Sequence, residues 1–170
     1  MEKEKQNKEA WILKVMQEHE GRLLGYAYRI VHSYELAQDI VQDTFLTLCK
    51  SDKDKIEQNL KAWLYKVCRN RALEILRKEK RMIELTETQL ATEVCLEKTP
   101  DKAFECSDSF AVALKLIDKL PQKQQEVVYL KYQNGLSYRE ISEIAEISVS
   151  NVGFLLHTAL AELRNQLQYQ

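Results

Sequence analysis

Residues 60–81, LKAWLYKVCRNRALEILRKEKR, combine an apolar face with a dense positive one. At 3.6 residues per turn, one side of a helix here carries Leu60, Trp63, Leu64, Val67, Cys68 and Ile75. Another side carries Lys66, Arg69, Arg77 and Lys80. A solvated surface helix also carries charges, but here eight basic residues stand against two acidic ones, and a phosphate backbone would relieve their repulsion. The stretch predicts a helix that packs on one face and binds an anion with the other.

The rest of the 170 residues favours two small helical domains. Only four glycines and two prolines are present, a shortage that favours long helices over turn-rich β structure. The net charge of −1 hides an uneven distribution of charge along the chain. Residues 82–108, which follow the basic stretch, hold seven acidic residues against two basic ones. We predict an all-α fold. An N-terminal helical bundle (residues 1–82) and a C-terminal helix-turn-helix bundle (109–170) are joined by a flexible acidic linker (83–108).

Several classes of function find no support in the sequence. The four cysteines are Cys49, Cys68, Cys95 and Cys106. They have no C-x-x-C spacing and no nearby histidine, so we predict neither a zinc site nor a redox motif, and unpaired thiols suit a reducing cytosol. No glycine-rich phosphate loop is present, and we expect no catalytic residue, metal or cofactor. No apolar run has the length of a signal peptide or membrane span, so we expect a cytoplasmic protein without direct membrane insertion.

The first domain is expected to contain several helices before the basic one. Residues 1–8 are charged and expected to be frayed, one helix is predicted from Glu9, and a second follows Gly21. A third helix over residues 34–50, with Ser33 as its N-cap, carries an apolar stripe of Ala37, Ile40, Val41, Thr44, Phe45 and Leu48. Its opposite face, Gln38, Asp39, Gln42 and Asp43, taken alone reads as solvated surface. Residues 51–59 are expected to form a loop.

The second domain shows the pattern of a helix-turn-helix. A new apolar pattern begins at residue 110, and Pro121 is expected at the first position of a helix that stops at residues 134–135, Asn-Gly. Ser137 and Glu140 form an S-x-x-E capping box, and Ser148 is expected to cap a further helix. Two short helices joined by so tight a turn predict a helix-turn-helix, although plain helical bundles show the same pattern.

Four blocks of the chain resemble, in family order, the extracytoplasmic-function (ECF, group IV) RNA polymerase sigma factors of the sigma-70 superfamily. These blocks are LGYAYRIV, AQDIVQDTFL, LKAWLYKVCRNRALEILR and LPQKQQEVVYLKYQNGLSYREISEIAEIS. Several motifs at the right separations are more specific than any one of them. The resemblance implies a subunit that binds core RNA polymerase and directs promoter-specific transcription initiation, recognising and helping to melt the −10 element and contacting the −35 element. It implies promoter DNA as a second partner, an anti-sigma factor as a common third, and no catalytic centre.

The resemblance also implies roles for individual residues. Those matching the polymerase-binding helix are Asp39, Gln42 and Asp43. Those matching the −10 segment are Lys61, Lys66, Arg69, Asn70, Arg77, Lys80 and Arg81. Those matching the −35 reader are Tyr138, Arg139, Ser148, Ser150, Asn151, Phe154 and His157. Residues 51–59 match the loop that holds a base flipped from the non-template strand, and the acidic linker matches the segment threaded through polymerase.

The sequence departs from the family pattern in three places. Cys49 replaces a large aromatic residue, and Glu146 replaces a turn glycine, at a cost of roughly 1 kcal/mol if its backbone is left-handed. The recognition helix lacks basic residues at Gly153, Leu155, Thr158, Leu160 and Ala161, leaving His157 and Arg164 as cations. We expect weak −35 binding. Alternatively, Phe154 and Leu155 form an apolar patch for a protein partner, in a factor that no longer reads upstream DNA.

Overall fold

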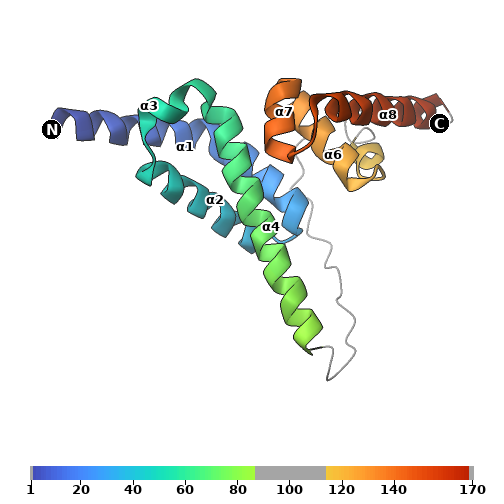
Figure 1. Ribbon diagram of the computed structural model, residues 1–170, viewed down its shortest axis with the longest axis horizontal. Helices are drawn as coiled ribbons and strands as arrows, with labels where there is room; N and C mark the ends of the chain where they lie inside the picture. Colours follow the sequence, from blue (N-terminus) through green and yellow to red (C-terminus); the bar gives the residue numbers. More distant parts are fainter. Residues whose placement is uncertain (1, 87–113, 169–170) are drawn as a thin grey trace. The chain divides into compact units, whose positions relative to one another are not determined.

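The computed structural model describes residues 2–86 and 114–168, with side chains over residues 6–82 and 114–167. These described residues form helices and connecting turns without any strand, which confirms the all-α prediction. The chain divides into two compact units, Met1–Lys98 and Thr99–Gln170 (Figure 1). Each unit has its own buried apolar core.

Three long helices form the first unit: α1 (Glu2–Val31), α2 (Tyr34–Lys50) and α4 (Leu60–Thr86). The connection from α2 to α4 is a short helix, α3 (Lys53–Ile56), followed by the 3₁₀ turn η1 (Glu57–Asn59). All three long helices pack against one another. At the centre of the unit the rings of Tyr26 and Tyr65 meet edge to face, with centroids 5.2 Å apart.

The prediction for α2 is confirmed in detail. The Ser33 side chain accepts a hydrogen bond from the backbone N–H of Leu36, so the helix begins at the expected cap. Its buried residues are the six of the predicted stripe, Ala37, Ile40, Val41, Thr44, Phe45 and Leu48. The packing face of α2 therefore follows directly from its apolar periodicity.

Two predictions for the first unit are wrong. A single helix, α1, runs through Gly21 and starts at Glu2 rather than Glu9. A glycine inside a helix costs only about 1 kcal/mol, and the fully buried Leu23 and Ala27 that follow it offset that cost by packing. Residues 51–59 are not an irregular loop, because the Asp52 carboxylate caps α3 by accepting from the Asp54 N–H at 3.2 Å.

The helix α4 contains the predicted basic stretch and continues to Thr86. Leu64 and Cys68 are buried as predicted, and so are three residues that the prediction omitted, Ala62, Tyr65 and Ala72. From Arg77 onward the described side chains are exposed, and this part of α4 extends beyond α1 and α2 (Figure 1). The helix is thus packed in its first half and projects in its second.

The second unit contains α6 (Gln122–Val128), the short π-helix η2 (Tyr129–Gln133), α7 (Tyr138–Ala145) and α8 (Val149–Gln168). Pro121 is the N-cap of α6, one position before its expected place. The helical run ends at residues 134–135 as predicted, with Gly135 at a φ of +64°. The first part of the apolar pattern predicted from residue 110, and the acidic linker from residue 87 onward, lie outside the described residues.

The helix-turn-helix is present between α7 and α8. The capping box is complete, because Ser137 Oγ accepts from the Glu140 N–H at 3.2 Å and Glu140 Oε2 accepts from the Ser137 N–H at 2.7 Å. Glu146 has φ 57° and ψ 43°, a left-handed conformation. Its N–H and that of Ile147 both donate to the Ser142 carbonyl. The turn therefore keeps the form that glycine favours, although a glutamate occupies it.

Among the helices over residues 2–86 and 114–168, none by itself has the length and apolar character to cross a membrane. The bent pair formed by α7 and α8 meets these two criteria only when both helices are taken together.

Candidate functional site

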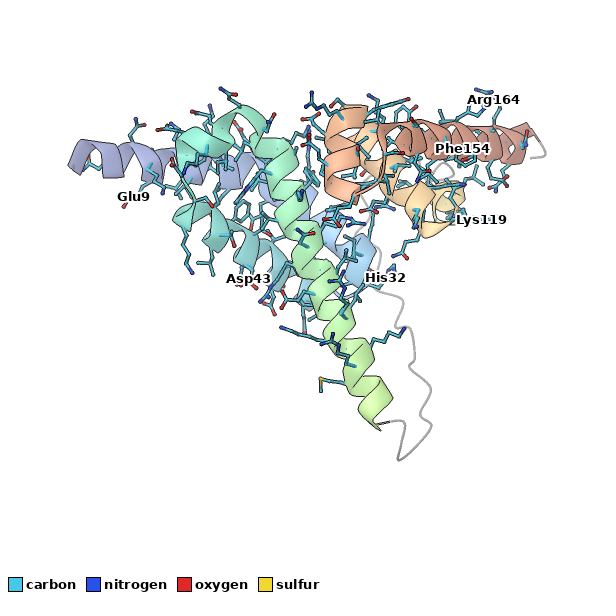
Figure 2. All side chains as sticks on the ribbon, viewed as in Figure 1. Glu9, His32, Asp43, Lys119, Phe154 and Arg164 are labelled. Carbon is cyan, nitrogen blue, oxygen red and sulfur yellow. The ribbon has the colours of Figure 1, made fainter. Side chains whose placement is uncertain are left out.

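The polar face of α2 contains the residues predicted to bind polymerase. Asp39 and Gln42 are exposed, whereas Asp43 is half-buried beside α4 (Figure 2). Arg71 Nε donates to Asp43 Oδ2 at 2.7 Å, and Arg71 Nη2 forms an ion pair with the same oxygen at 2.7 Å. Arg71 Nη1 also donates to Glu74 Oε2 at 2.8 Å. The face of α2 is therefore connected to α4 by an ion pair that sequence reasoning missed, since nothing in the sequence relates two residues 28 positions apart.

This ion pair continues along α4. Lys78 Nζ lies 2.8 Å from Glu74 Oε1, so Glu74 joins two cations. Hydrogen bonds from Lys78 and then from Arg71 lower the pKa of Glu74, and hydrogen bonds to Glu74 and then to Asp43 raise the pKa of Arg71. Arg71 and Lys78 are thus paired with carboxylates inside the unit.

The structure brings all seven predicted −10 residues onto α4. Lys66, Asn70, Arg77, Lys80 and Arg81 are exposed, and Lys61 and Arg69 are half-buried. Because α4 is one continuous helix, the residues of the stripe keep a common side along its length. We refer to Lys66, Arg69, Arg77 and Lys80 as the basic stripe. Repulsion within a stripe of one sign favours an anionic ligand such as a phosphate backbone.

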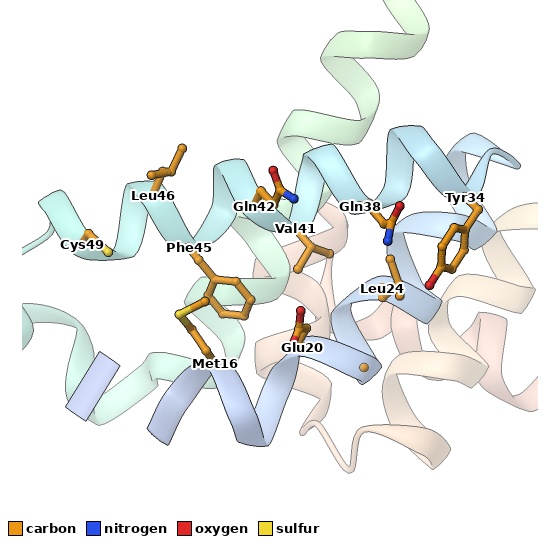
Figure 3. A pocket seen from close by; sticks show the side chains of 11 residues that line it. Met16, Glu20, Leu24, Tyr34, Gln38, Val41, Gln42, Phe45, Leu46 and Cys49 are labelled. Carbon is orange, nitrogen blue, oxygen red and sulfur yellow. The ribbon is translucent and has the colours of Figure 1, made fainter. Parts of the chain in front are cut away.

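A groove of about 500 Å³ lies between α1 and α2. Phe45 and Met16 extend toward one another inside it, whereas Leu46 and Gln42 point away from α1 (Figure 3). Cys49 lines the rim of the groove and is exposed, and the neighbouring Leu48 is fully buried. The loss of an aromatic residue at position 49 therefore leaves the core of α2 intact.

Seven residues of the second unit were predicted to read the −35 element, and all seven are exposed: Tyr138, Arg139, Ser148, Ser150, Asn151, Phe154 and His157. Ser148 Oγ accepts from the Asn151 N–H at 3.2 Å, which confirms Ser148 as the cap of α8. Lys131 Nζ lies 5.3 Å from the centroid of the Tyr138 ring, so η2 places a cation beside this surface that the sequence did not assign.

Phe154 is the most exposed large apolar residue of the described second unit, with 64% of its surface accessible (Figure 2). It lies on the side of α8 opposite to the buried Val152, Leu156 and Ala159. An apolar ring in this place can contact the methyl group of a thymine or a protein surface.

Thr158 of α8 makes two hydrogen bonds that the sequence did not indicate. Thr158 was counted among the positions that lack a DNA-binding cation, but its Oγ1 accepts from Gln124 Nε2 at 3.4 Å and donates to the Phe154 carbonyl at 2.9 Å. The Thr158 side chain therefore contacts α6 through the Gln124 amide. Leu155 is half-buried.

Potential metal ligands and the buried thiol of Cys68 can be located within the described residues. Among residues 2–86 and 114–168, no group of three or more His, Cys, Asp or Glu side chains is arranged to hold a metal ion. Burial raises the pKa of the Cys68 thiol to about 12, so this thiol stays protonated.

Family models and relatives match both units. Residues 15–82 match the model for sigma-70 region 2, and residues 111–163 match the model for sigma-70 region 4. The ECF RNA polymerase sigma factor SigW of Bacillus subtilis is 28% identical over 88% of this chain and 85% of its own length. RNA polymerase sigma factor SigV of Bacillus subtilis is 25% identical over 97% of this chain and 96% of its own.

Two solved structures have the same fold. One is the sigma factor RpoE in complex with the anti-sigma factor NepR from Bartonella quintana, with a TM-score of 0.60 and 21% identity over 91% of this chain and 97% of that chain. The other is CnrH in complex with the cytosolic domain of CnrY, with a TM-score of 0.60 and 20% identity over 94% of this chain and 88% of that chain.

Proposed function

Because the chain belongs to the sigma-70 family, as an ECF sigma factor that directs promoter-specific transcription initiation, we propose how its helices divide this work. Residues 1–82 bind core RNA polymerase and the −10 element, and residues 109–170 contact the −35 element. Residues 83–108 join the two domains. Sigma factors are not enzymes, and the partners of this one are core polymerase and promoter DNA. Since both partners occupy the cytoplasm, we expect the protein there.

Core polymerase binds the exposed side of α2 in this proposal. The observation that carries it is the separation of faces on α2, where Asp39 and Gln42 are exposed opposite a fully buried stripe. Asp43 contributes one edge of this face, in the orientation that Arg71 gives it. Since exposed charges contribute at most about 1 kcal/mol to stability, the face is available to a partner at little cost to the fold.

Charge reversal on α2 tests this assignment. Asp39→Lys should weaken core binding, measured by fluorescence anisotropy of the labelled full chain, while the thermal midpoint stays nearly unchanged. Glu18→Lys is the matched control, because Glu18 is an exposed carboxylate on α1 that pairs only weakly with Lys14, at 3.9 Å. Equal core affinity of Asp39→Lys and wild type would remove the docking assignment.

The −10 element meets α4 and the segment before it. The basic stripe contacts phosphates, and residues 51–59 hold the base that leaves the non-template strand. Extrusion of a base costs a few kcal/mol of stacking free energy. A binding site for that base close to the stripe must therefore offset this cost by its own contacts. The support for this proposal is that segment 51–59 runs directly into the N-terminus of α4.

A −35 reader and a protein-binding surface are both compatible with α8. Exposed Ser150 and Asn151 favour contacts to base edges, whereas the exposed ring of Phe154 favours a protein partner. Both solved structures are complexes with another protein, in one of them named as an anti-sigma factor. We propose an anti-sigma partner for this chain too. In holoenzyme, Asn151→Ala should impair open-complex formation if α8 reads DNA. A holoenzyme indifferent to Asn151→Ala and Phe154→Ala would assign the surface to a protein.

A further inference from the structure

The N-terminal turns of α1 contact the connection between α2 and α4 at two points. Lys8 Nζ donates to the Ser51 carbonyl at 2.9 Å, across 43 positions of sequence. Lys53 Nζ lies 5.4 Å from the centroid of the Trp11 indole ring. Lys8 and Trp11 share the side of α1 that buries Ile12. These contacts continue the packing face of α1 beyond the core of the bundle.

Among the side chains of residues 6–82, few other contacts hold this connection, which comprises residues 51–59. Ile56 is buried, and the Asp52 carboxylate caps α3 locally. Among the remaining residues, Asp54, Lys55, Glu57, Gln58 and Asn59 are exposed. The segment is therefore an accessible stretch with one buried side chain, whose N-terminal half is attached to α1.

Each of the two contacts fixes a definite part of the segment. The Ser51 carbonyl lies at the C-terminus of α2, where carbonyl groups lack helical partners and a cation is favoured by the helix dipole. Lys53 also pairs with Glu57, at 3.5 Å, while it lies over the Trp11 ring. Trp11 thus acts on both α3 and η1 through a single lysine.

We propose that Lys8 and Trp11 are positioning residues for segment 51–59, and that they sharpen its selectivity for the unpaired base of the −10 element. The inference rests on the proposed function, in which this segment holds that base. A pocket for a flipped base discriminates only when its walls are held in place, because a wall that relaxes accepts several shapes. On this chain the N-terminus of α1 provides that support from outside the DNA-binding surface.

The variants for the test are Lys8→Ala and Trp11→Ala in the full chain, assembled with core polymerase. Leu13→Ala and Lys14→Ala are matched controls, since both residues lie on the same helix and are exposed, and Lys14 pairs only with Glu18 in the contacts described. Lys8→Arg and Trp11→Phe are conservative variants that retain a donor and an aromatic ring. Thermal denaturation of each variant reports whether its fold is intact.

The probe is a set of premelted promoter templates, built on a promoter mapped by run-off transcription. Each unpaired non-template position of the −10 element is replaced in turn by all four bases, and the position with the largest wild-type preference is kept. The measured quantity is the ratio of complex stability with the preferred base to that with the least preferred base. Lys8→Ala and Trp11→Ala should lower this ratio by about threefold or more, whereas the controls and the conservative variants should preserve it.

The outcomes separate this inference from the proposed function. A wild-type holoenzyme with no base preference at any −10 position would refute the role of segment 51–59 itself. A wild-type preference that survives both alanine substitutions would refute only the positioning role. An equal loss of binding with all four bases would mean that the contacts support the fold and not selectivity, which also overturns the inference. If Trp11→Ala does not fold, the base-preference ratio of Lys8→Ala alone tests the inference, because Lys8 is half-exposed.

Discussion

At Glu146, a side chain occupies a left-handed backbone conformation, with a φ of +57°. For residues other than glycine this region costs roughly 1–2 kcal/mol. A glycine would remove this cost, but it would also increase the conformational entropy of the unfolded chain, which offsets part of the gain in stability. Glu146→Gly should therefore raise the free energy of unfolding by about 1 kcal/mol. Thermal denaturation followed by circular dichroism measures this change. The matched control is Glu143→Gly in α7, which should lower stability by a similar amount.

Cys68 makes stability depend on pH in the alkaline range. Burial raises the pKa of its thiol to about 12, whereas an unfolded cysteine ionises near about 8.5. Between these values the folded state binds more protons, so the free energy of unfolding falls as pH rises, by up to about 1.4 kcal/mol per unit from this group. Urea denaturation between about pH 7.5 and 9.5, which is about 1 unit on either side of the thiol pKa in the unfolded chain, should show this decline. Cys68→Ala should flatten it, and an unchanged pH dependence would contradict the assignment.

Single residues also show where sequence reasoning ends. Local signals worked well: the Ser33 cap and the capping box of Ser137 and Glu140 concern residues within a few positions of each other. The ion pair of Asp43 with Arg71 joins two helices, and no local pattern specifies which surface charges meet. The orientation of Thr158 was missed for the same reason, because it depends on Gln124 of α6.

Among the helices, α4 supports a quantitative prediction about DNA. If each residue of the basic stripe contacts a phosphate, the logarithm of promoter affinity falls with the logarithm of salt concentration by about 0.9 units per contact. Lys66→Ala and Arg77→Ala in holoenzyme should each flatten this slope by roughly that amount and weaken all promoters alike. Lys78→Ala is the control, because Lys78 pairs with Glu74 on another side of α4.

Changes in sequence preference by Lys66→Ala or Arg77→Ala would mean that the residue reads bases. If neither variant changes the slope, the stripe is a solvated surface, as its charge alone would also allow.

Helix existence was easier to predict than helix extent. The apolar stripe of α2 predicted its burial completely, because the helix is amphipathic and begins at a strong cap. The prediction of two helices in place of α1 was wrong because a glycine weakens a helix by only about 1 kcal/mol, less than the packing on either side of Gly21 supplies. The turns at α3 and η1 were missed because four helical residues leave no periodicity to detect.

For the whole molecule, we predict that −35 recognition depends on tethering through polymerase. With Gly153, Leu160 and Ala161 in place of cations on α8, the fragment of residues 109–170 should bind duplex DNA poorly at physiological salt. A linker to a domain already bound supplies an effective concentration that compensates for this weakness. Electrophoretic mobility shifts of the fragment, compared with footprinting of holoenzyme, measure the difference.

Gly153→Lys should raise the affinity of the fragment several-fold, because a side chain there meets only the Tyr138 ring at an ordinary distance of 3.7 Å. Gly153→Ala serves as the comparison and should bring no such gain, since it adds a Cβ at the same place without a charge. Tight and sequence-specific binding by the unmodified fragment would refute the dependence on tethering.

The length of α4 also determines how far apart along the DNA its basic residues can contact phosphates. Eight residues separate Arg69 from Arg77, or about 12 Å along a helix, and a DNA strand advances about 3.4 Å per nucleotide. The two halves of the stripe would therefore meet phosphates three to four nucleotides apart, by this rough estimate. One alanine inserted after Leu76 would turn Arg77 and Lys80 by about 100° and misalign them, whereas four alanines would return them to within about 40° of their original side. Promoter affinities of such an insertion series would show whether DNA binding depends on Arg77 and Lys80 keeping the same side of one rigid helix as Lys66 and Arg69.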